Sequence, residues 1–259
     1  MELRDQTMLL EQTLTQLRDL RINGMADALE EQQAVPDVQS LSFEDRLALL
    51  VEREATVRQD RRLTRLLRQA KLRLPATIED LDLRSPRGLD RSVILRLASS
   101  GWIRNHQVVL ITGATGTGKT YLACALAQAA CRQGFASRYI RLTRLIDDMA
   151  LARADGSYPR LMNRLQKLDL LAIDDYGLAP LNQIERRDLL EVVEDRTGRR
   201  ATLVASQLPL EHWHEVVGDA TFADAILDRL VHHAHRITLK GASMRRKEAK
   251  TTKQNAVSA

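Results

Sequence analysis

The sequence predicts an α/β fold, with a parallel sheet flanked by helices, preceded by a small all-α N-terminal domain. Apolar runs of strand length alternate with helix-length amphipathic segments through residues 105–246, which is typical of a doubly wound sheet. The first 75 residues instead have the periodicity of helices. A chain of 259 residues has room for one domain of roughly 150 to 170 residues and a smaller one.

The first 75 residues are expected to form three or four packed helices. Leucines recur at helical spacing in residues 10–17, and Pro36 ends a second short helix. Ser42, with Asp45 three residues later, is typical of the capped start of a third helix. A fourth helix is predicted around residues 60–72, where apolar side chains form one stripe. This region carries no chemistry of its own.

The fourth predicted helix is strongly basic. The net charge is +5, and residues 53–74 alone hold seven Arg and one Lys against two acids. Such a helix can lie along a phosphate backbone, and binding would then weaken steeply with salt and depend little on base sequence. The alternative is a solvated helix face with local ion pairs. The candidate contacts to double-stranded DNA are Arg58, Arg61, Arg62, Arg65, Arg68 and Lys71.

A glycine-rich octapeptide follows the apolar, β-branched run at residues 108–111 and fits the phosphate-loop pattern GxxxxGK[ST]. Its glycines let successive N–H groups point at phosphate oxygens, Lys119 reaches the β- and γ-phosphates, and the Thr120 hydroxyl can ligate Mg²⁺. The Ala/Leu-rich helix predicted after it turns its positive end to the phosphates. The sequence therefore predicts a nucleoside triphosphate site. Its residues are Gly113, Ala114, Thr115, Gly116, Thr117, Gly118, Lys119, Thr120 and Tyr121.

Two acids end a later buried strand. The apolar run at residues 170–173 is followed by Asp174 and Asp175, which is the Walker B pattern. A strand of this kind holds its terminal carboxylate beside the phosphate loop, so Asp174 would support Mg²⁺ through its water shell. Asp175 would then polarise the attacking water. The alternative is a solvated strand end without chemistry.

Two further polar residues are candidates for the hydrolytic step. A short apolar strand at residues 201–205 leads into Ser206 and Gln207, and a polar side chain there can reach between the γ-phosphate and the water. Gln207 is preferred to Ser206, and the alternative is a turn residue. A helix at residues 223–233 bears Arg229, which could meet the γ-phosphate of a neighbouring subunit as an arginine finger or form a surface salt bridge.

Several segments together resemble one family of ATPases. They are residues 112–134, the run Asp-Asp-Tyr-Gly-Leu at 174–178, the run Ser-Gln-Leu-Pro at 206–209 with Trp213, and residues 225–230 and 241–245. In series they resemble the IstB-type helper ATPases of bacterial insertion sequences, AAA+ proteins related to DnaC-type helicase loaders. The resemblance covers nearly the whole chain, because the helical N-terminal region also looks like the leading domain of that family.

The resemblance implies an AAA+ P-loop NTPase that uses ATP and Mg²⁺ and hydrolyses ATP in an assembly on double-stranded target DNA. It also implies a homo-oligomer that recruits or stimulates a cognate transposase. By match of motif, the catalytic residues are Lys119 for phosphate, Asp174 for the metal, Asp175 for water, Gln207 as first sensor, Arg229 as arginine finger and Arg245 as second sensor, with Arg246 as the alternative to Arg245.

Other functions compete with this one. A DnaC-type replicative helicase loader would share every nucleotide motif, but the basic helix and residues 241–245 favour the transposition helper. A nucleotide-switched DNA scaffold would scarcely hydrolyse ATP, which the intact Asp174, Asp175 and Arg229 argue against. A small-molecule kinase is disfavoured because no substrate lid is evident. Many AAA+ proteins have Glu where Asp175 stands, so the shorter carboxylate predicts slow basal hydrolysis.

The motifs divide the chain into four parts. Residues 1–75 are expected to be the helical domain for DNA binding and assembly, 76–104 a connector with one helix, 105–246 the AAA+ ATPase domain, and 247–259 a basic, disordered tail. The charged N-terminus does not read as a signal peptide, and no apolar run approaches the roughly 18 residues of a membrane span. We therefore expect a cytoplasmic protein without a membrane partner.

Cysteine and histidine are expected to carry no chemistry here. Cys124 and Cys131 lie seven residues apart on one predicted helix, too far for a disulfide, and are expected to be reduced core residues. A zinc site is disfavoured because no Cys or acid stands at suitable spacing from the histidines. These are His212, His214, His232, His233 and His235.

Overall fold

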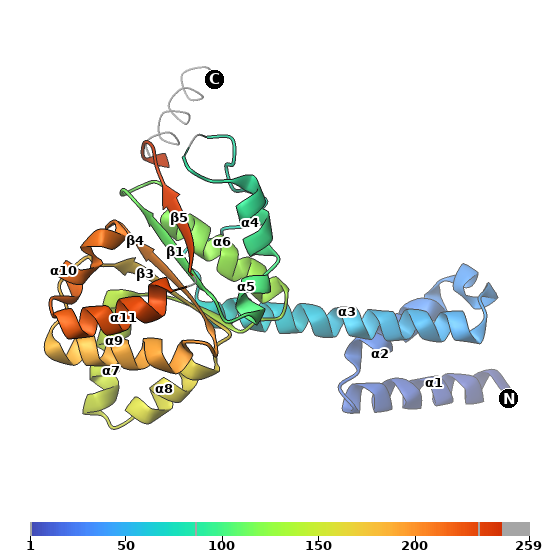
Figure 1. Ribbon diagram of the computed structural model, residues 1–259. Coiled ribbons are helices and arrows are strands. Elements are labelled where there is room, and N and C mark those ends of the chain that lie inside the picture. Colours follow the sequence, from blue (N-terminus) through green and yellow to red (C-terminus); the bar gives the residue numbers. More distant parts are fainter. Residues whose placement is uncertain (1, 86, 233, 245–259) are drawn as a thin grey trace, which may run out of the picture. The chain divides into compact units, whose positions relative to one another are not determined.

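A computed structural model describes residues 2–85, 87–232 and 234–244 of the chain (Figure 1). The chain divides into two compact units, Met1–Arg65 and Leu66–Ala259. The boundary between the units lies ten residues before the one predicted at residue 75. It falls within a helix, so that the last turn of that helix belongs to the second unit. The tail expected at residues 247–259 lies outside the described residues.

The first unit is built from helices, which are α1 (Glu2–Asp19), α2 (Asn23–Ala34), a 3-10 turn η1 (Pro36–Ser40) and most of α3 (Phe43–Ala70). The prediction of separate third and fourth helices is wrong, because both segments belong to the single helix α3. No glycine or proline interrupts its 28 residues, so nothing breaks the ladder of hydrogen bonds. The predicted cap is confirmed, since Ser42 Oγ accepts from the Asp45 N–H at 3.1 Å.

A buried carboxylate joins α2 to α3. Glu54 on α3 accepts from Arg58 Nε at 2.6 Å and from the Met25 N–H at 3.2 Å. The hydrogen bond from Arg58 is the largest of the effects that lower the pKa of Glu54. Gly24 allows this close approach, because a Cβ there would lie 3.0 Å from Glu54. Arg58, one of the candidate DNA contacts, thus already has an acidic partner.

The second unit contains a five-stranded parallel sheet with the strand order β2-β3-β4-β1-β5. Because the strands are parallel, their carboxyl ends share one edge, where ligands of open α/β sheets bind. The predicted α/β fold with a parallel sheet is confirmed. The strands are β1 (Val108–Gly113), β2 (Ser137–Arg141), β3 (Leu170–Tyr176), β4 (Ala201–Ser206) and β5 (His235–Leu239).

Helices cover both faces of this sheet, and each face has its own apolar cluster. One cluster involves α4 (Arg91–Ala98), α5 (Gly101–Arg104) and α6 (Lys119–Arg132). The other involves α7 (Leu142–Ala154), α8 (Tyr158–Lys167), α9 (Gln183–Arg196), α10 (Trp213–Val217) and α11 (Ala220–Val231), with a 3-10 turn η2 (Leu210–His212) between β4 and α10. None of the described helices is long and apolar enough to cross a membrane.

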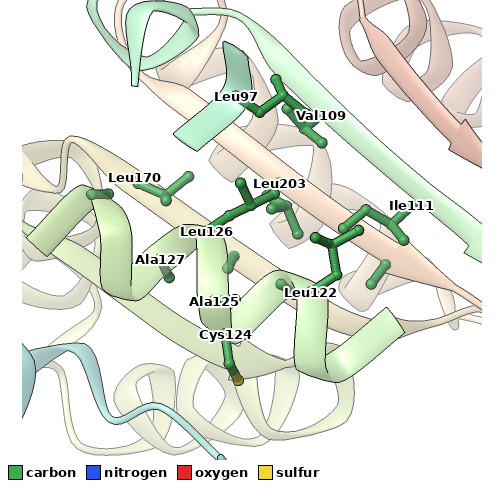
Figure 2. Packing of buried hydrophobic residues seen from close by; sticks show 14 of the residues in the cluster. Leu97, Val109, Ile111, Leu122, Cys124, Ala125, Leu126, Ala127, Leu170 and Leu203 are labelled. Carbon is green, nitrogen blue, oxygen red and sulfur yellow. The ribbon is translucent and has the colours of Figure 1, made fainter. Parts of the chain in front are cut away.

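Helix α6 packs on the sheet through leucines and alanines. Figure 2 shows Leu122 and Leu126 directed at the strands, near Ile111 and Leu203, while Cys124 points the other way. These residues are almost fully buried, as expected for a helix that follows the central strand β1. Both cysteines are buried and free, as predicted. The packing fixes the start of α6 at the carboxyl end of β1.

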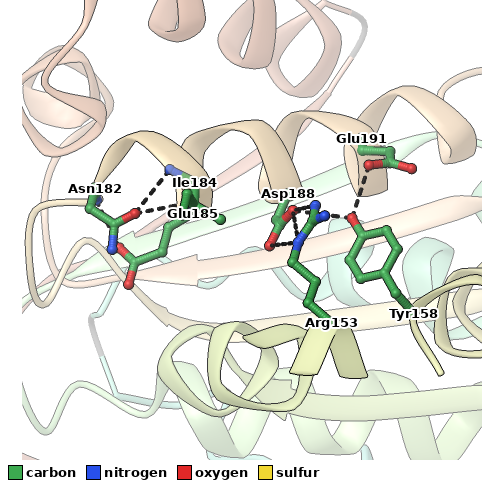
Figure 3. Close-up of polar contacts among 7 residues, drawn as sticks. All are labelled: Arg153, Tyr158, Asn182, Ile184, Glu185, Asp188 and Glu191. Carbon is green, nitrogen blue, oxygen red and sulfur yellow. Dashed lines mark hydrogen bonds and ion pairs between the residues drawn. The ribbon is translucent and has the colours of Figure 1, made fainter. Parts of the chain in front are cut away.

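Polar contacts hold α9 on the opposite face (Figure 3). Asn182 caps the helix, accepting from the Glu185 N–H at 3.1 Å, while the Glu185 carboxylate accepts from the Asn182 N–H at 2.8 Å. Farther along, the buried Asp188 pairs with Arg153 of α7 and accepts from the Tyr158 hydroxyl at 3.1 Å. Since Asp188 is almost fully buried, these partners offset its desolvation.

Arg196, the last residue of α9, is a buried guanidinium bound by backbone carbonyls. It donates to the carbonyls of Leu165, Leu168 and Ala201 and, at 3.2 Å, to Thr202 Oγ1. Burial lowers its pKa to about 9, so it still carries a charge at neutral pH. Arg196 therefore ties the ends of α8 and α9 to the start of β4.

Arg196→Ala is expected to lower the free energy of unfolding by about 3 kcal/mol, because it leaves buried carbonyls without a donor and opens a cavity. Urea denaturation followed by circular dichroism measures the change. The exposed neighbour Arg199 supplies the control, and Arg199→Ala should stay within about 0.5 kcal/mol of the wild type. Equal losses in the two variants would contradict the role assigned to Arg196.

Candidate functional site

The glycine-rich loop between β1 and α6 contains three glycines with positive φ angles. Gly113, Gly116 and Gly118 have φ angles of 149°, 84° and 100°, a region that side chains rarely adopt. Space is also short, since a Cβ on Gly113 would lie 2.4 Å from Leu239 O, and one on Gly116 would lie 2.3 Å from Ser243 Oγ. The loop leads straight into the N-terminus of α6, an arrangement that suits an anion.

Lys119 holds its ammonium group over this loop. Its Nζ donates to Gly113 O at 2.7 Å and to Ala114 O at 2.9 Å, and the side chain is buried. The carbonyls thus keep the positive charge at the loop. Tyr121, the last of the predicted nucleotide contacts, packs partly buried against the core of the α6 face.

Thr120 and Asp174 meet across the site. Thr120 Oγ1 donates to Asp174 Oδ2 at 2.7 Å, and the Tyr139 hydroxyl donates to the same oxygen at 2.7 Å. Asp174 Oδ1 accepts the Asp175 N–H at 2.8 Å. A protein hydroxyl and a carboxylate placed together fit Mg²⁺, which takes one or two protein oxygens and completes its shell with water and phosphate.

The two acids lie at an irregularity in β3. The pairing with β4 runs from Ile173 opposite Val204 to Tyr176 opposite Ser206, so β3 contains one extra residue. Asp175 there has a φ of 58°, in the left-handed region. Successive side chains of a regular strand point to opposite faces. The bulge and the left-handed residue change that direction. Asp174 bonds Thr120 at the start of α6, and Asp175 lies near enough to Lys119 for the charge of Lys119 to act on it.

Asp175 lies in a partly buried, electrostatically mixed environment. Burial raises its pKa, and the neighbouring Asp174 raises it further. Positive charges on Arg73, Arg141 and Lys119 oppose this rise. Arg73 Nη1 is 3.7 Å from Asp175 Oδ2, which makes it the ion-pair partner of this carboxylate. A carboxylate held in this way can accept a proton from a water molecule.

Gln207 and Ser206 have different surroundings, although they are adjacent. Gln207 Oε1 accepts from Thr115 Oγ1 of the phosphate loop at 2.7 Å. Ser206 is fully buried, and its Oγ donates to Tyr176 O at 2.7 Å and accepts from the Leu208 N–H at 3.1 Å. The structure therefore brings Gln207 to the loop and uses Ser206 to hold the ends of β3 and β4.

Of the two arginines of the motif match, the structure describes only Arg229. Arg229 on α11 donates to Ala225 O at 2.9 Å and pairs with Glu194 of α9 at 3.0 Å, with 28% of its side chain exposed. It makes no described contact with the phosphate loop. Arg245, like Arg246, lies outside the described residues. The residue before it, Met244, donates its N–H to Gly116 O at 2.8 Å.

The structure brings three side chains to the site that sequence motifs missed. Arg87 is buried and donates to Thr117 O at 3.3 Å while Asp82 O holds its other nitrogens. Tyr139 could have been noticed, because its strand β2 lies beside β3 and a tyrosine hydroxyl there needs a partner. Arg73 has no local signal, since its contacts are far away in sequence.

The candidate DNA contacts are exposed along α3. Arg58, Arg61, Arg62 and Arg65 belong to the first unit, and Arg68 and Lys71 to the second. Arg58 is bound to Glu54, as in the local ion-pair alternative. Over residues 2–85, 87–232 and 234–244, no group of three or more His, Cys, Asp or Glu side chains is arranged to hold a metal ion.

Comparison with known proteins identifies close relatives. The family model described as "IstB-like ATP binding protein" matches residues 15–252. The chain is similar to "Putative insertion sequence ATP-binding protein y4pL" of Sinorhizobium fredii, with 49% identity over 241 residues, which cover 93% of this chain and 98% of that protein. The match therefore includes both units.

Solved structures resemble this chain in fold. The structure of DnaI has a TM-score of 0.56 at 19% identity and covers 68% of this chain and 94% of its own. The structure of the DnaC helicase loader has a TM-score of 0.50 at 16% identity and covers 57% of this chain and 87% of its own. The fold is that of AAA+ P-loop proteins.

Ser206→Ala and Gln207→Ala are expected to separate stability from turnover. Ser206→Ala should lower the free energy of unfolding by about 1–3 kcal/mol, because a buried carbonyl and N–H lose their partner. Gln207→Ala should leave the melting temperature unchanged and lower the rate of nucleotide hydrolysis. Thermal melts and phosphate release on both variants measure this, and a Gln207→Ala variant with full turnover would remove that residue from the site.

Proposed function

The chain belongs to the family of IstB-like ATP binding proteins, and from this premise we propose an ATP-dependent, DNA-binding helper of transposition. It binds and hydrolyses ATP with Mg²⁺, oligomerises on double-stranded target DNA, and recruits or stimulates a partner transposase. The observation that carries the proposal is the meeting of Thr120, Asp174 and Asp175 beside the phosphate loop. A protein that acts on the DNA of its cell would work in the cytoplasm.

Each side chain of the site has a role in hydrolysis. The N–H groups of residues 113–118 and the Lys119 ammonium bind the phosphates. Thr120 and Asp174 would hold Mg²⁺, which neutralises charge on the phosphate oxygens when bound. Asp175 accepts the proton of the attacking water, and Gln207 orients that water. Because Asp175 is one methylene shorter than glutamate, slow turnover in the absence of a partner fits this site.

Assembly would complete the site. Arg229 lies at the surface in an ion pair with a half-exposed partner, and such pairs contribute only about 0–1 kcal/mol. The guanidinium can therefore leave Glu194 at small cost and meet a nucleotide on a neighbouring subunit. An arginine supplied in trans accelerates phosphoryl transfer by about 10³–10⁵-fold. ATP hydrolysis would in this way depend on oligomerisation.

The exposed basic face of α3 supports DNA as the partner, and the insertion-sequence name of the relative supports transposition. A DnaC-type helicase loader is the competing function. The likeness of the DnaC helicase loader to this chain is one of fold, at 16% identity over 57% of the chain. The similarity to the insertion-sequence protein extends over 93% of the chain, including the basic helix, so the helper is preferred.

Turnover of ATP should rise with long duplex DNA and more than linearly with protein concentration, because neighbouring subunits on DNA complete one another's sites. Phosphate release measured with and without DNA across protein concentrations tests this. Asp175→Ala is expected to lower turnover about 10²–10⁴-fold while it keeps ATP binding, since it removes the base alone. Tight binding of ATP and DNA without any hydrolysis would instead identify a nucleotide-switched scaffold.

Arg229→Ala should leave ATP affinity nearly unchanged and abolish the DNA-stimulated part of turnover, because the arginine acts on a neighbouring subunit. Glu194→Ala is the matched control, since it breaks the same ion pair and keeps the arginine. Fluorescent-nucleotide binding and phosphate release compare the two. If both variants lose stimulation equally, the ion pair itself matters, and the role of Arg229 in trans is rejected.

A further inference from the structure

Arg73 connects the end of α3 to the acid pair. It follows the last helical residue, Ala70, by three positions, and Nη1 lies 3.7 Å from Asp175 Oδ2. About half of its side chain is exposed, whereas Asp175 is mostly covered. A solvated guanidinium that reaches toward a partly buried carboxylate is not needed for folding, because exposed pairs contribute little to stability.

The guanidinium also contacts the other carboxylate through Tyr139. A hydrogen bond to Tyr139, together with the charges of Asp175 and Asp174, raises the pKa of Arg73. The Tyr139 hydroxyl in turn donates to Asp174 Oδ2 at 2.7 Å. One arginine therefore acts on both acids, on Asp175 by charge and on Asp174 through a buried tyrosine.

The distance to Asp175 decides what this contact can do. At 3.7 Å the two atoms attract each other but are too far apart for a hydrogen bond. The ion pair orients the carboxylate without a hydrogen bond from Nη1 to the lone pairs of Oδ2. A residue that inhibited Asp175 would be expected to occupy those lone pairs in a close bidentate pair. The geometry is that of a positioning residue.

The backbone that carries Arg73 is fixed to the nucleotide-binding unit. Arg138 of β2 donates to Gln69 O in the last turn of α3 at 3.4 Å. The backbone at Arg73 and Leu74 lies close enough to the Cys124 thiol of α6 to lower its pKa, against the rise caused by burial. Lys71, with a φ of 48°, ends the helix. A shift of this last turn would move Arg73 relative to both acids.

We propose that Arg73 is a positioning residue that links the basic end of α3 to the Asp175 carboxylate. The proposal rests on the proposed function, because DNA bound at Arg68 and Lys71 would act on ATP hydrolysis through it. Arg73 aligns Asp175 with the attacking water and touches neither nucleotide nor DNA. Its loss therefore acts on kcat and leaves binding intact.

Arg73→Gln keeps most of the side chain and removes its charge. We expect the kcat of DNA-stimulated hydrolysis to fall roughly tenfold or more, while KM for ATP and Kd for duplex DNA stay within about twofold of wild type. Arg73→Lys restores a charge near Asp175 and should recover most of the rate. Arg144→Ala, which removes an exposed arginine paired with Asp148 on α7, is the matched control and should behave as wild type.

An unchanged kcat in Arg73→Gln, or no recovery in Arg73→Lys, would overturn the proposal, as would a rise in KM that accounts for the whole loss. Thermal melts of the three variants exclude unfolding as the cause. If DNA fails to stimulate the wild type, the proposed function fails by itself. The basal kcat then still tests the role of Arg73. Equal basal rates in wild type and Arg73→Gln would reject Arg73 as a positioning residue.

Discussion

The site depends on the irregular end of β3. A regular strand would point Asp174 and Asp175 to opposite faces of the sheet, and one of them would be lost to the site. The extra residue in β3 and the left-handed conformation of Asp175 change this direction, so that both acids lie near the start of α6, Asp174 bonded to Thr120 and Asp175 within reach of the charge of Lys119. Such a conformation costs about 1–3 kcal/mol. The next residue, Tyr176, anchors this end of β3, because the centroid of its ring lies 4.3 Å from that of the buried Trp213.

The phosphate loop depends on equally close packing. A Cβ added to its glycines would meet the backbone at Leu239, the side chain of Ser243 or the guanidinium of Arg87. These groups come from the end of β5, the segment after it and the connector before α4. A side chain at any of the three glycines would collide with one of these segments. The loop is therefore shaped from outside as well as by its own sequence. The segment after β5 is joined directly to Gly116, since the Met244 N–H donates to Gly116 O at 2.8 Å.

Local pattern was sufficient for most of the fold and for part of the site. Strands β1, β3 and β4 begin at the apolar runs that predicted them, because each run is short and alternates with helix-length segments. The sequence pattern does not show the continuity of α3, because its apolar residues give way to basic ones, although no helix breaker stands there. Arg73 and Arg87 were missed because their partners are distant in sequence. Periodicity carries no information on such contacts.

The charges around the acid pair indicate how the site can be controlled. Burial and the negative charge of Asp174 both oppose ionisation of Asp175, and three positive groups favour it. Lys119 belongs to the phosphate loop and Arg141 ends β2, so both are set by the sheet and its first loop. Arg73 alone among the three follows the last turn of α3. Under the proposed function it is thus the one of these charges through which DNA bound to the arginines of α3 could align Asp175, while the sheet keeps the other two in place.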